Sequence, residues 1–358
     1  MKKRILGLVI LALVIVSAVA YQNFLRPKFR KVTADGYLGG EKSGLFDDER
    51  FSGVMLKKYG LSIHYKKAGS IDMISAPLEN MDYLFPSNYT ALELYRQQYG
   101  SAYTRTETVF NSPIVLYTRK TVSEAFKKQG WTHTENETEY INLPKLIDAI
   151  LADTAWSGVG LDELYGNLYV ISTDPLKSNS GNMFAGLVAN MLNGGEVATG
   201  ESLKTDGREL KRFFSKLGYL ESSSADLFNS FLKTGIGAKP VIVGYESQIL
   251  EFSVEHPEEW EHVRDDIVVL YPEPTVWSAH PFIALTDKGD RVLDALLEEE
   301  IQSLAWETHG FRTGIASAQQ RGGRFGIKGL PGQVKKVIQL PSPDTMFKIM
   351  EIISNRTP

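Results

Sequence analysis

Strand-like and helix-like stretches alternate along the chain from Asp35 onward, and this alternation is the feature that most restricts the fold. Apolar runs at 61–65, 81–85 and 113–117 read as strands, and patterns at 43–59 and 89–98 read as helices. Such alternation predicts a largely parallel sheet covered by helices. Ligands of such sheets bind beyond the carboxyl ends of the strands, so we expect a binding site there.

A second block of the same kind follows. It is predicted to contain helices at 121–129, 143–151, 206–217 and 224–233, with strands at 167–172, 240–244, 266–270 and 281–285. Helices are expected at 290–306 and 344–353, and the Gly-, Gln- and Arg-rich segment 314–328 reads as an exposed loop. At 358 residues the chain is long enough for two ordinary domains or one large one.

The N-terminus carries an export signal. A basic triplet at 2–4 precedes an uncharged apolar run at 5–20, so the rest of the chain is expected outside the cytoplasm. The run is slightly short of the roughly 20 residues that span a bilayer, but flanking apolar residues can extend it. Ala18-Val19-Ala20 offers a cleavage site. Residues 1–30 are therefore either a retained membrane-anchoring hydrophobic helix, which the basic residues after it favour, or a cleaved signal.

Composition excludes several function classes. A net charge of −4 gives no basic surface for phosphate backbones, so nucleic acid is not expected as a partner. The chain has no cysteine, which excludes disulfides, thiol catalysis and a lipid-modified N-terminal cysteine. Its six histidines show no His-x-x-x-His spacing, so no metal site and no cofactor are indicated.

Enzymatic motifs are also missing. Residues 36–43 nearly match a phosphate-binding loop, but Glu41 stands at the position of the second glycine, where a carboxylate would face the phosphates. No Gly-x-Ser-x-Gly elbow supplies a nucleophile. The chain is therefore expected not to be an enzyme.

Short polar segments at strand ends and helix starts predict a binding site. The clearest is Ser178-Asn179-Ser180-Gly181, where hydroxyls, an amide and backbone N–H groups gather at a helix start that favours negative charge. An ordinary helix cap is the alternative for any one such turn, but the pattern recurs. The full set of expected ligand-binding residues is Lys42, Ser43, Ser87, Asn88, Ser112, Ser178, Asn179, Ser180 and Tyr245.

The order of these segments resembles the type II periplasmic binding proteins, the substrate-binding components of ABC importers. The resemblance covers about residues 35–315. It rests on GGEKS at 39–43, DYLFPSN at 82–88, NSPIVL at 111–116, STDPLKSNSG at 172–181, GYESQ at 244–248, YP at 271–272, HP at 280–281, EIQ at 300–302 and GFR at 310–312.

The resemblance implies an α/β fold of two lobes, each a mostly parallel sheet flanked by helices, that close on a ligand at their interface. The first lobe would comprise residues 35–118 and be completed by 268–358 with the C-terminal helices, and the second lobe would be 119–267. Crossing strands would lie near 117–120 and 268–271. Arg312 is expected either to add positive charge at the cleft or to be a surface charge.

The implied function is capture of a small polar or anionic ligand for import through an ABC permease. Relatives that bind sulfate, molybdate or phosphate suggest an oxyanion, whereas iron-binding relatives use adjacent tyrosines that this chain lacks. Amino-acid and peptide ligands remain open, because their carboxylates use the same helix-start donors. The alternative is a membrane-anchored sensor or interaction module that keeps the fold without a transported ligand.

Overall fold

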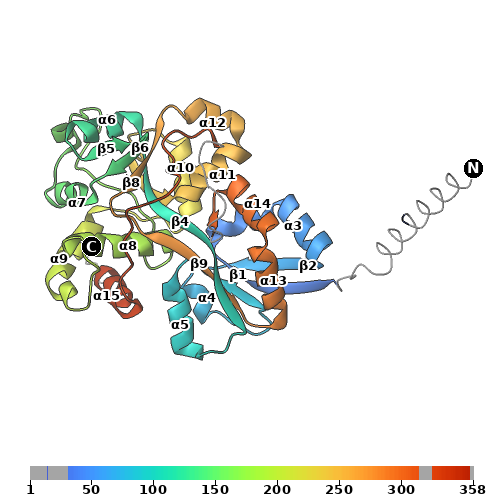
Figure 1. Cartoon of the computed structure of the whole chain (residues 1–358). Helices are drawn as coiled ribbons and strands as arrows, with labels where there is room; N and C mark the ends of the chain where they lie inside the picture. Colours follow the sequence, from blue (N-terminus) through green and yellow to red (C-terminus); the bar gives the residue numbers. More distant parts are fainter. Residues whose placement is uncertain (1–13, 15–30, 314–324, 355–358) are drawn as a thin grey trace, which may run out of the picture.

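The computed structural model describes Val14, residues 31–313 and residues 325–354. The expected N-terminal hydrophobic helix and most of the expected loop at 314–328 lie outside the described residues. Within the described ranges, no helix is both long and apolar enough to cross a bilayer. The elements form two lobes with β4 and β9 running between them (Figure 1).

The first lobe has a sheet in the order β2-β1-β3-β9-β4, and β10 also pairs with β4. Its strands are β1 (Val32–Leu38), β2 (Leu61–Lys67), β3 (Tyr83–Phe85), the first part of β4 (Arg105–Arg119), β9 (Trp277–Ala284) and β10 (Arg312–Thr313). Its helices are η2 (Gly40–Lys42), α2 (Ser43–Asp47), α3 (Glu49–Val54), η3 (Met55–Tyr59), α4 (Asp72–Ser75), α5 (Tyr89–Tyr99), α13 (Asp287–Leu297) and α14 (Glu299–His309).

The second lobe continues the sheet as β4-β8-β6-β5, with β7 also paired to β4. Its own strands are β5 (Thr132–Glu135), β6 (Thr138–Ile141), β7 (Val241–Tyr245) and β8 (Ile267–Pro272). Its helices are α6 (Lys120–Lys128), α7 (Leu143–Leu151), η4 (Trp156–Val159), α8 (Asn179–Leu192), α9 (Ser202–Lys216), α10 (Ser224–Lys233), α11 (Glu246–Glu255), α12 (Pro257–Val263) and α15 (Pro343–Ser354).

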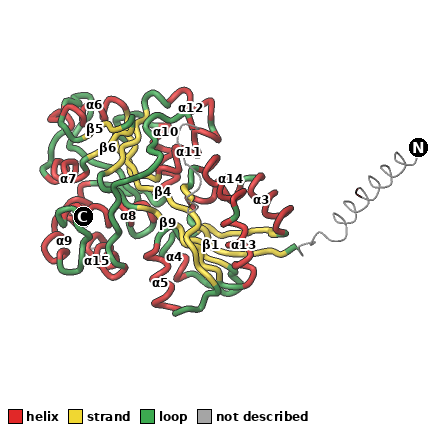
Figure 2. Tube along the Cα trace, viewed as in Figure 1, coloured by secondary structure: helices red, strands yellow, loops and turns green. Residues whose placement is uncertain are grey.

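Strand β4 belongs to both lobes, as the continuous yellow trace in Figure 2 shows. Residues 105–113 pair with β9, and residues 114–119 pair with β7 and β8. The chain therefore crosses between lobes near Pro113, and the second crossing lies between β8 and β9. The crossings were expected at 117–120 and 268–271, but residues 117–119 and 268–271 lie in strands of the second sheet, and Lys120 begins α6.

The prediction of mostly parallel sheets is wrong. The pairs β1–β2, β1–β3 and β6–β8 are parallel, but β4 is antiparallel to each described strand it pairs with, namely β7, β8, β9 and β10. The β3–β9 and β5–β6 pairs are antiparallel too. The fold is therefore mixed α/β, because the chain passes between the lobes twice in opposite directions.

Two long predicted helices are interrupted. The helix expected at 43–59 breaks at Asp48, whose backbone is extended and whose side chain accepts a hydrogen bond from the Arg50 N–H. The helix expected at 290–306 lies in α13 and α14, which are separated at the extended residue Glu298. The strand expected at 167–172 is absent, and Ile171 makes only an isolated bridge to Ile242. Helices α7 and α10 are confirmed with the bounds predicted.

Helix α8 positions the centre of the second lobe. Its side chains from Asn179 to Met191 are all buried, and it packs against α7, α9 and α15. The close approach of α8 to residue 173 requires glycine at 181, because a Cβ there would lie 2.1 Å from the Thr173 carbonyl oxygen. The first turn of α8 is thereby packed directly against the backbone of Thr173.

Candidate functional site

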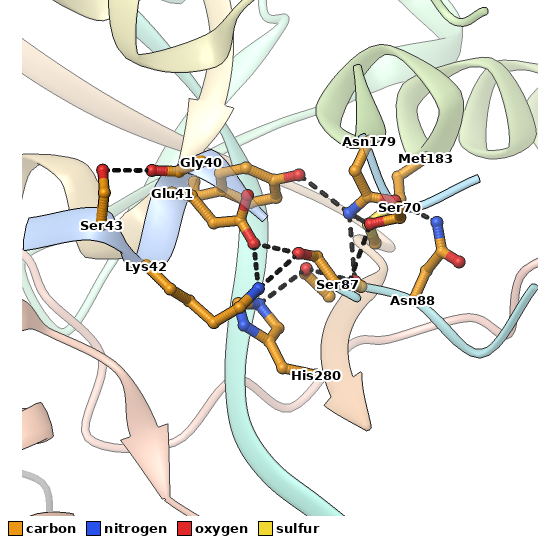
Figure 3. A network of polar contacts seen from close by, with 12 residues as sticks. Gly40, Glu41, Lys42, Ser43, Ser70, Ser87, Asn88, Asn179, Met183 and His280 are labelled. Atoms are coloured by element: carbon orange, nitrogen blue, oxygen red, sulfur yellow. Dashed lines mark hydrogen bonds and ion pairs between the residues drawn. The ribbon is translucent and has the colours of Figure 1, made fainter. Parts of the chain in front are cut away.

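Asn179 joins the two lobes. Its Nδ2 donates to the Ser87 carbonyl oxygen at 3.0 Å, on the first lobe, and to the Tyr245 hydroxyl at 2.9 Å, on the second. The Asn88 side chain in turn donates to Asn179 Oδ1 (Figure 3). The structure therefore brings Ser87, Asn88, Asn179 and Tyr245 together, as the sequence predicted, but they bind one another.

The other two residues of the predicted turn have different partners. Ser178 occupies the N-cap position of α8 with extended backbone, yet its hydroxyl makes no cap hydrogen bond. It lies 3.3 Å from the Ser180 hydroxyl, which is itself 2.7 Å from the Thr173 hydroxyl. Ser180 is buried, so it supports the turn, whereas Ser178 remains partly exposed to a neighbouring hollow.

Lys42 is buried and paired. Its Nζ contacts Glu41, donates to the Ser87 hydroxyl at 2.7 Å and lies 4.8 Å from the centre of the Phe85 ring. Burial alone would raise the pKa of Glu41, but the adjacent Lys42 ammonium, the Ser87 hydroxyl and the nearby His280 together outweigh burial, and the pKa falls to about 2. Lys42 is therefore neutralised by Glu41, and its charge is not available to a bound anion.

Three further buried groups complete this network. The Ser278 hydroxyl donates to the Ser87 carbonyl oxygen at 2.8 Å and lies 3.0 Å from His280 Nε2. Burial lowers the pKa of His280 well below its ordinary value, so its ring is neutral. Burial also raises the pKa of Tyr245 well above its ordinary value, so its hydroxyl keeps its proton.

Two predicted residues have helix-start roles. The buried Ser112 hydroxyl accepts a hydrogen bond from the Ser247 N–H at the beginning of α11. The Ser43 hydroxyl donates to the Gly40 carbonyl oxygen at 2.7 Å, next to the hollow described below. Arg312 is neither a cleft charge nor a surface charge, because it is buried and forms two hydrogen bonds to Glu246, at 2.6 and 2.9 Å.

A polar hollow of about 400 Å³ opens between the lobes next to the Asn179 network. The first lobe contributes the η2 loop and residues 67–70, and the second contributes residues 177–179 and 222–226. A narrow cavity of about 10 Å³, lined in part by Asn88, Ser178 and Asn179, continues from it. Two helix starts, those of α8 and α10, face this hollow.

Sequence reasoning missed four serines of the hollow, Ser70, Ser222, Ser223 and Ser224. The triple serine at 222–224 carries the same signal as the turn at 178–180, because Ser223 caps α10 by accepting from the Asp226 N–H. Ser70 had no such signal. Its hydroxyl accepts from the Ser87 N–H at 2.9 Å, a contact between distant segments.

The fold is shared with solved solute-binding proteins. The chain is similar to a putative extracellular solute-binding protein from Bordetella parapertussis, with a TM-score of 0.59 and 10% identity over 91% of this chain and 99% of that one. It is also similar to the apo ferric ion-binding protein A of Pasteurella haemolytica (TM-score 0.57, 10% identity, 90% and 96% covered). A third similar structure is the sulfate-binding protein of Mycobacterium tuberculosis, with a TM-score of 0.52 and 13% identity over 87% of this chain and 94% of that one.

No family model and no curated protein sequence matches the chain. The expected resemblance is thus confirmed for the fold, two α/β lobes with crossing strands between them.

Proposed function

We propose that this protein is an exported, non-catalytic solute-binding protein that captures a small polar or anionic ligand between its lobes. The observation that carries the proposal is the hollow of about 400 Å³, which both lobes line with hydroxyls and helix starts. Helix-start N–H groups are ready donors to carboxylates and oxyanions. The solved proteins of this fold named above, for sulfate and ferric ion, support a binding role.

The charges around the hollow define how an anion would be held. Because Glu41 and Lys42 neutralise each other, the remaining charged side chains that line the hollow are the two lysines Lys67 and Lys177 and the single carboxylate Asp226. An oxyanion or carboxylate would be bound mainly by hydroxyls, by backbone N–H groups and by the two lysines. A ligand that also carries an ammonium group would find the Asp226 carboxylate in the same hollow.

The export signal completes the proposal. The basic N-terminus and apolar run at 5–20 place the described lobes outside the cytoplasm, anchored at the membrane when the segment is retained. From there the protein would deliver its ligand to an ABC permease. A reporter fused after Pro358 should be active only outside the cytoplasm, and activity confined to the cytoplasm would refute export.

The binding role is tested by a thermal-unfolding screen of anions, amino acids, peptides and sugars, followed by calorimetry. A ligand at 100 times its dissociation constant should stabilise the native state by about 2.7 kcal/mol. Ser178→Ala should lower the affinity for that ligand by at least about fivefold. It should cost little stability, because the Ser178 hydroxyl makes no cap hydrogen bond.

The matched control is Ser342→Ala. That serine accepts from the Thr345 N–H at the start of α15 and does not line the hollow, so its loss should lower stability and leave affinity unchanged. A screen in which no compound raises the unfolding temperature would favour the alternative, a sensor or interaction module that keeps the fold without a transported ligand.

A further inference from the structure

A second polar cluster lies where three helical segments meet, and its residues do not line the interlobe hollow. His309 ends α14, Glu251 and Glu255 lie one turn apart on α11, and Asp48 separates α2 from α3. The His309 Nδ1 atom is 2.6 Å from Glu251 Oε1 and 3.9 Å from Glu255 Oε1. Its Nε2 atom is 3.1 Å from Asp48 Oδ2. The imidazole is buried, whereas 38% of the Glu255 side chain is exposed.

This arrangement has the parts of a metal site. Imidazole nitrogen and carboxylate oxygens are ligands that Zn²⁺ and similar divalent ions accept. One atom from each of Glu251, Glu255 and His309 lies within 4.8 Å of the others. A tetrahedral ion bound at about 2.1 Å needs its ligand atoms roughly 3.4 Å apart. Binding an ion would therefore require the Glu251 oxygen to move away from His309 Nδ1, now 2.6 Å from it, and the exposed Glu255 side chain to rotate toward them.

Asp48 and Gly44 shape the site. A hydrogen bond from His309 Nε2 to Asp48 would orient the ring and leave Nδ1 directed at the two glutamates, as carboxylates behind ligating histidines commonly do. Gly44 leaves room for the Glu251 carboxylate, because a Cβ at this position would lie 2.0 Å from Glu251 Oε1. The space between α2 and α11 is thus fitted to a carboxylate.

The charges of the cluster can accommodate a divalent cation. Three carboxylates meet at the cluster, and the Arg50 guanidinium is bonded to one of them, Asp48. With His309 protonated, these groups keep one negative charge in excess. With a divalent ion bound to neutral His309, they balance. Within the described residues, Glu255 accepts no hydrogen bond and makes one ion pair, the long one to His309.

The ion can reach the site. Glu251 and Glu255 line a hollow of about 820 Å³ that also borders Gly44, His256, Glu259 and His262. We propose that Glu251, Glu255 and His309 bind a divalent transition-metal ion, with Zn²⁺ as the representative ion, and so link α11 of the second lobe to α14 of the first. This site was not predicted from the sequence, because His309 on α14 lies far along the chain from the two glutamates on α11.

The test uses the untagged full chain, freed of metal with a chelator, and ZnCl₂ as the probe. Calorimetry should show one bound ion per chain, and Zn²⁺ should raise the unfolding temperature. Glu255→Gln should weaken Zn²⁺ binding by at least about tenfold. Its metal-free unfolding temperature should stay near that of the wild type, because the contacts of His309 to Glu251 and Asp48 remain.

Two control variants line the same hollow without belonging to the cluster. Glu259→Gln and His262→Gln should bind Zn²⁺ as the wild type does. Absence of Zn²⁺ binding, unchanged binding in Glu255→Gln, or an equal loss in His262→Gln would overturn the proposal. None of these outcomes bears on the interlobe ligand, since the hollow between the lobes is lined by neither glutamate.

Discussion

The buried Glu41–Lys42 ion pair is the interaction on which the electrostatics of the candidate site most depend. Glu41→Gln would leave the Lys42 ammonium buried with only the Ser87 hydroxyl as a strong partner. Breaking a buried pair from one side costs about 3 to 5 kcal/mol, so the free energy of unfolding should fall by that amount in urea denaturation. Glu41→Gln/Lys42→Met should recover most of the loss. A double variant as unstable as the single one would show that the ion pair is not the cause.

The same carboxylate predicts a pH dependence of stability. The pKa of Glu41 falls from 4.5 to about 2 on folding, so between these values the unfolded chain binds more protons than the folded one. The stabilisation is complete above pH 4.5 and is lost as the pH falls toward 2. Other carboxylates add to this slope, so the measured quantity is the difference between wild type and Glu41→Gln in unfolding free energy. That difference should shrink as acid is added; a constant difference would contradict the shift.

Single residues also mark where sequence reasoning ends. The turn at 178–180 was found because a helix start is encoded locally by serine and asparagine. It was not predicted that Lys42 and Arg312 would each be buried in an ion pair with a carboxylate. Glu41 is adjacent in sequence and contacts Lys42 directly, with Ser87 bonded to both, whereas Glu246 reaches Arg312 only through the tertiary fold. The residue type shows that a side chain is cationic, but only tertiary packing decides whether a ligand can contact that charge.

At the scale of elements, hydrophobic periodicity located most helices but not their interruptions. The breaks at Asp48 and Glu298 occur at acidic residues that periodicity alone does not distinguish from helical positions. At Asp48 the helix ends because the side chain caps α3 and faces His309, a residue far along the chain. Sheet direction was mispredicted for a similar reason, since alternation of element types does not reveal that β4 enters both sheets.

Two helical glycines give a matched test of how α8 is packed. In Gly181→Ala the new Cβ would lie 2.1 Å from the Thr173 carbonyl oxygen, so the backbone must shift and stability should fall by about 1 to 3 kcal/mol. Gly53→Ala in α3 makes the same chemical change with no atom within 4 Å of the new Cβ, and should stabilise by about 0.5 to 1 kcal/mol. The unfolding temperatures of both variants, compared with that of the wild type, test this prediction. Equal effects would mean that the α8 contact is not restrictive.

At the scale of the whole molecule, the C-terminal segment reconnects the lobes. After β10 in the first lobe, residues 336–338 pair with Thr275 beside the second crossing, and the Gln339 carbonyl oxygen accepts from Asn190 of α8. Helix α15 then packs on α8 and α9 and also contacts α5 of the first lobe, as its place beside α8 and α9 in Figure 1 indicates. Its Met346 and Ile349 complete the second lobe's core. The division of the chain into residues 35–118, 119–267 and 268–358 stays a prediction.

The lobes are held together here by their own side chains, and this predicts how the molecule opens. Asn179→Ala removes the bonds to Ser87 and Asn88 across the interface, each of which contributes about 0.5 to 1.5 kcal/mol. Losing both should shift the equilibrium toward open molecules by about fivefold to a hundredfold. Small-angle scattering should therefore show a larger radius of gyration for this variant without ligand.

Asn182→Ala is the matched control for that opening. It changes the same residue type on the same helix, but Asn182 bonds to Pro175 and Met350, neither of which is in the first lobe. Its radius of gyration should equal that of the wild type. A ligand closes the lobes only through contacts that the open state lacks, so saturating Asn179→Ala should require a higher ligand concentration than saturating the wild type. Equal radii for the two variants would show that the Asn179 bonds do not hold the lobes closed.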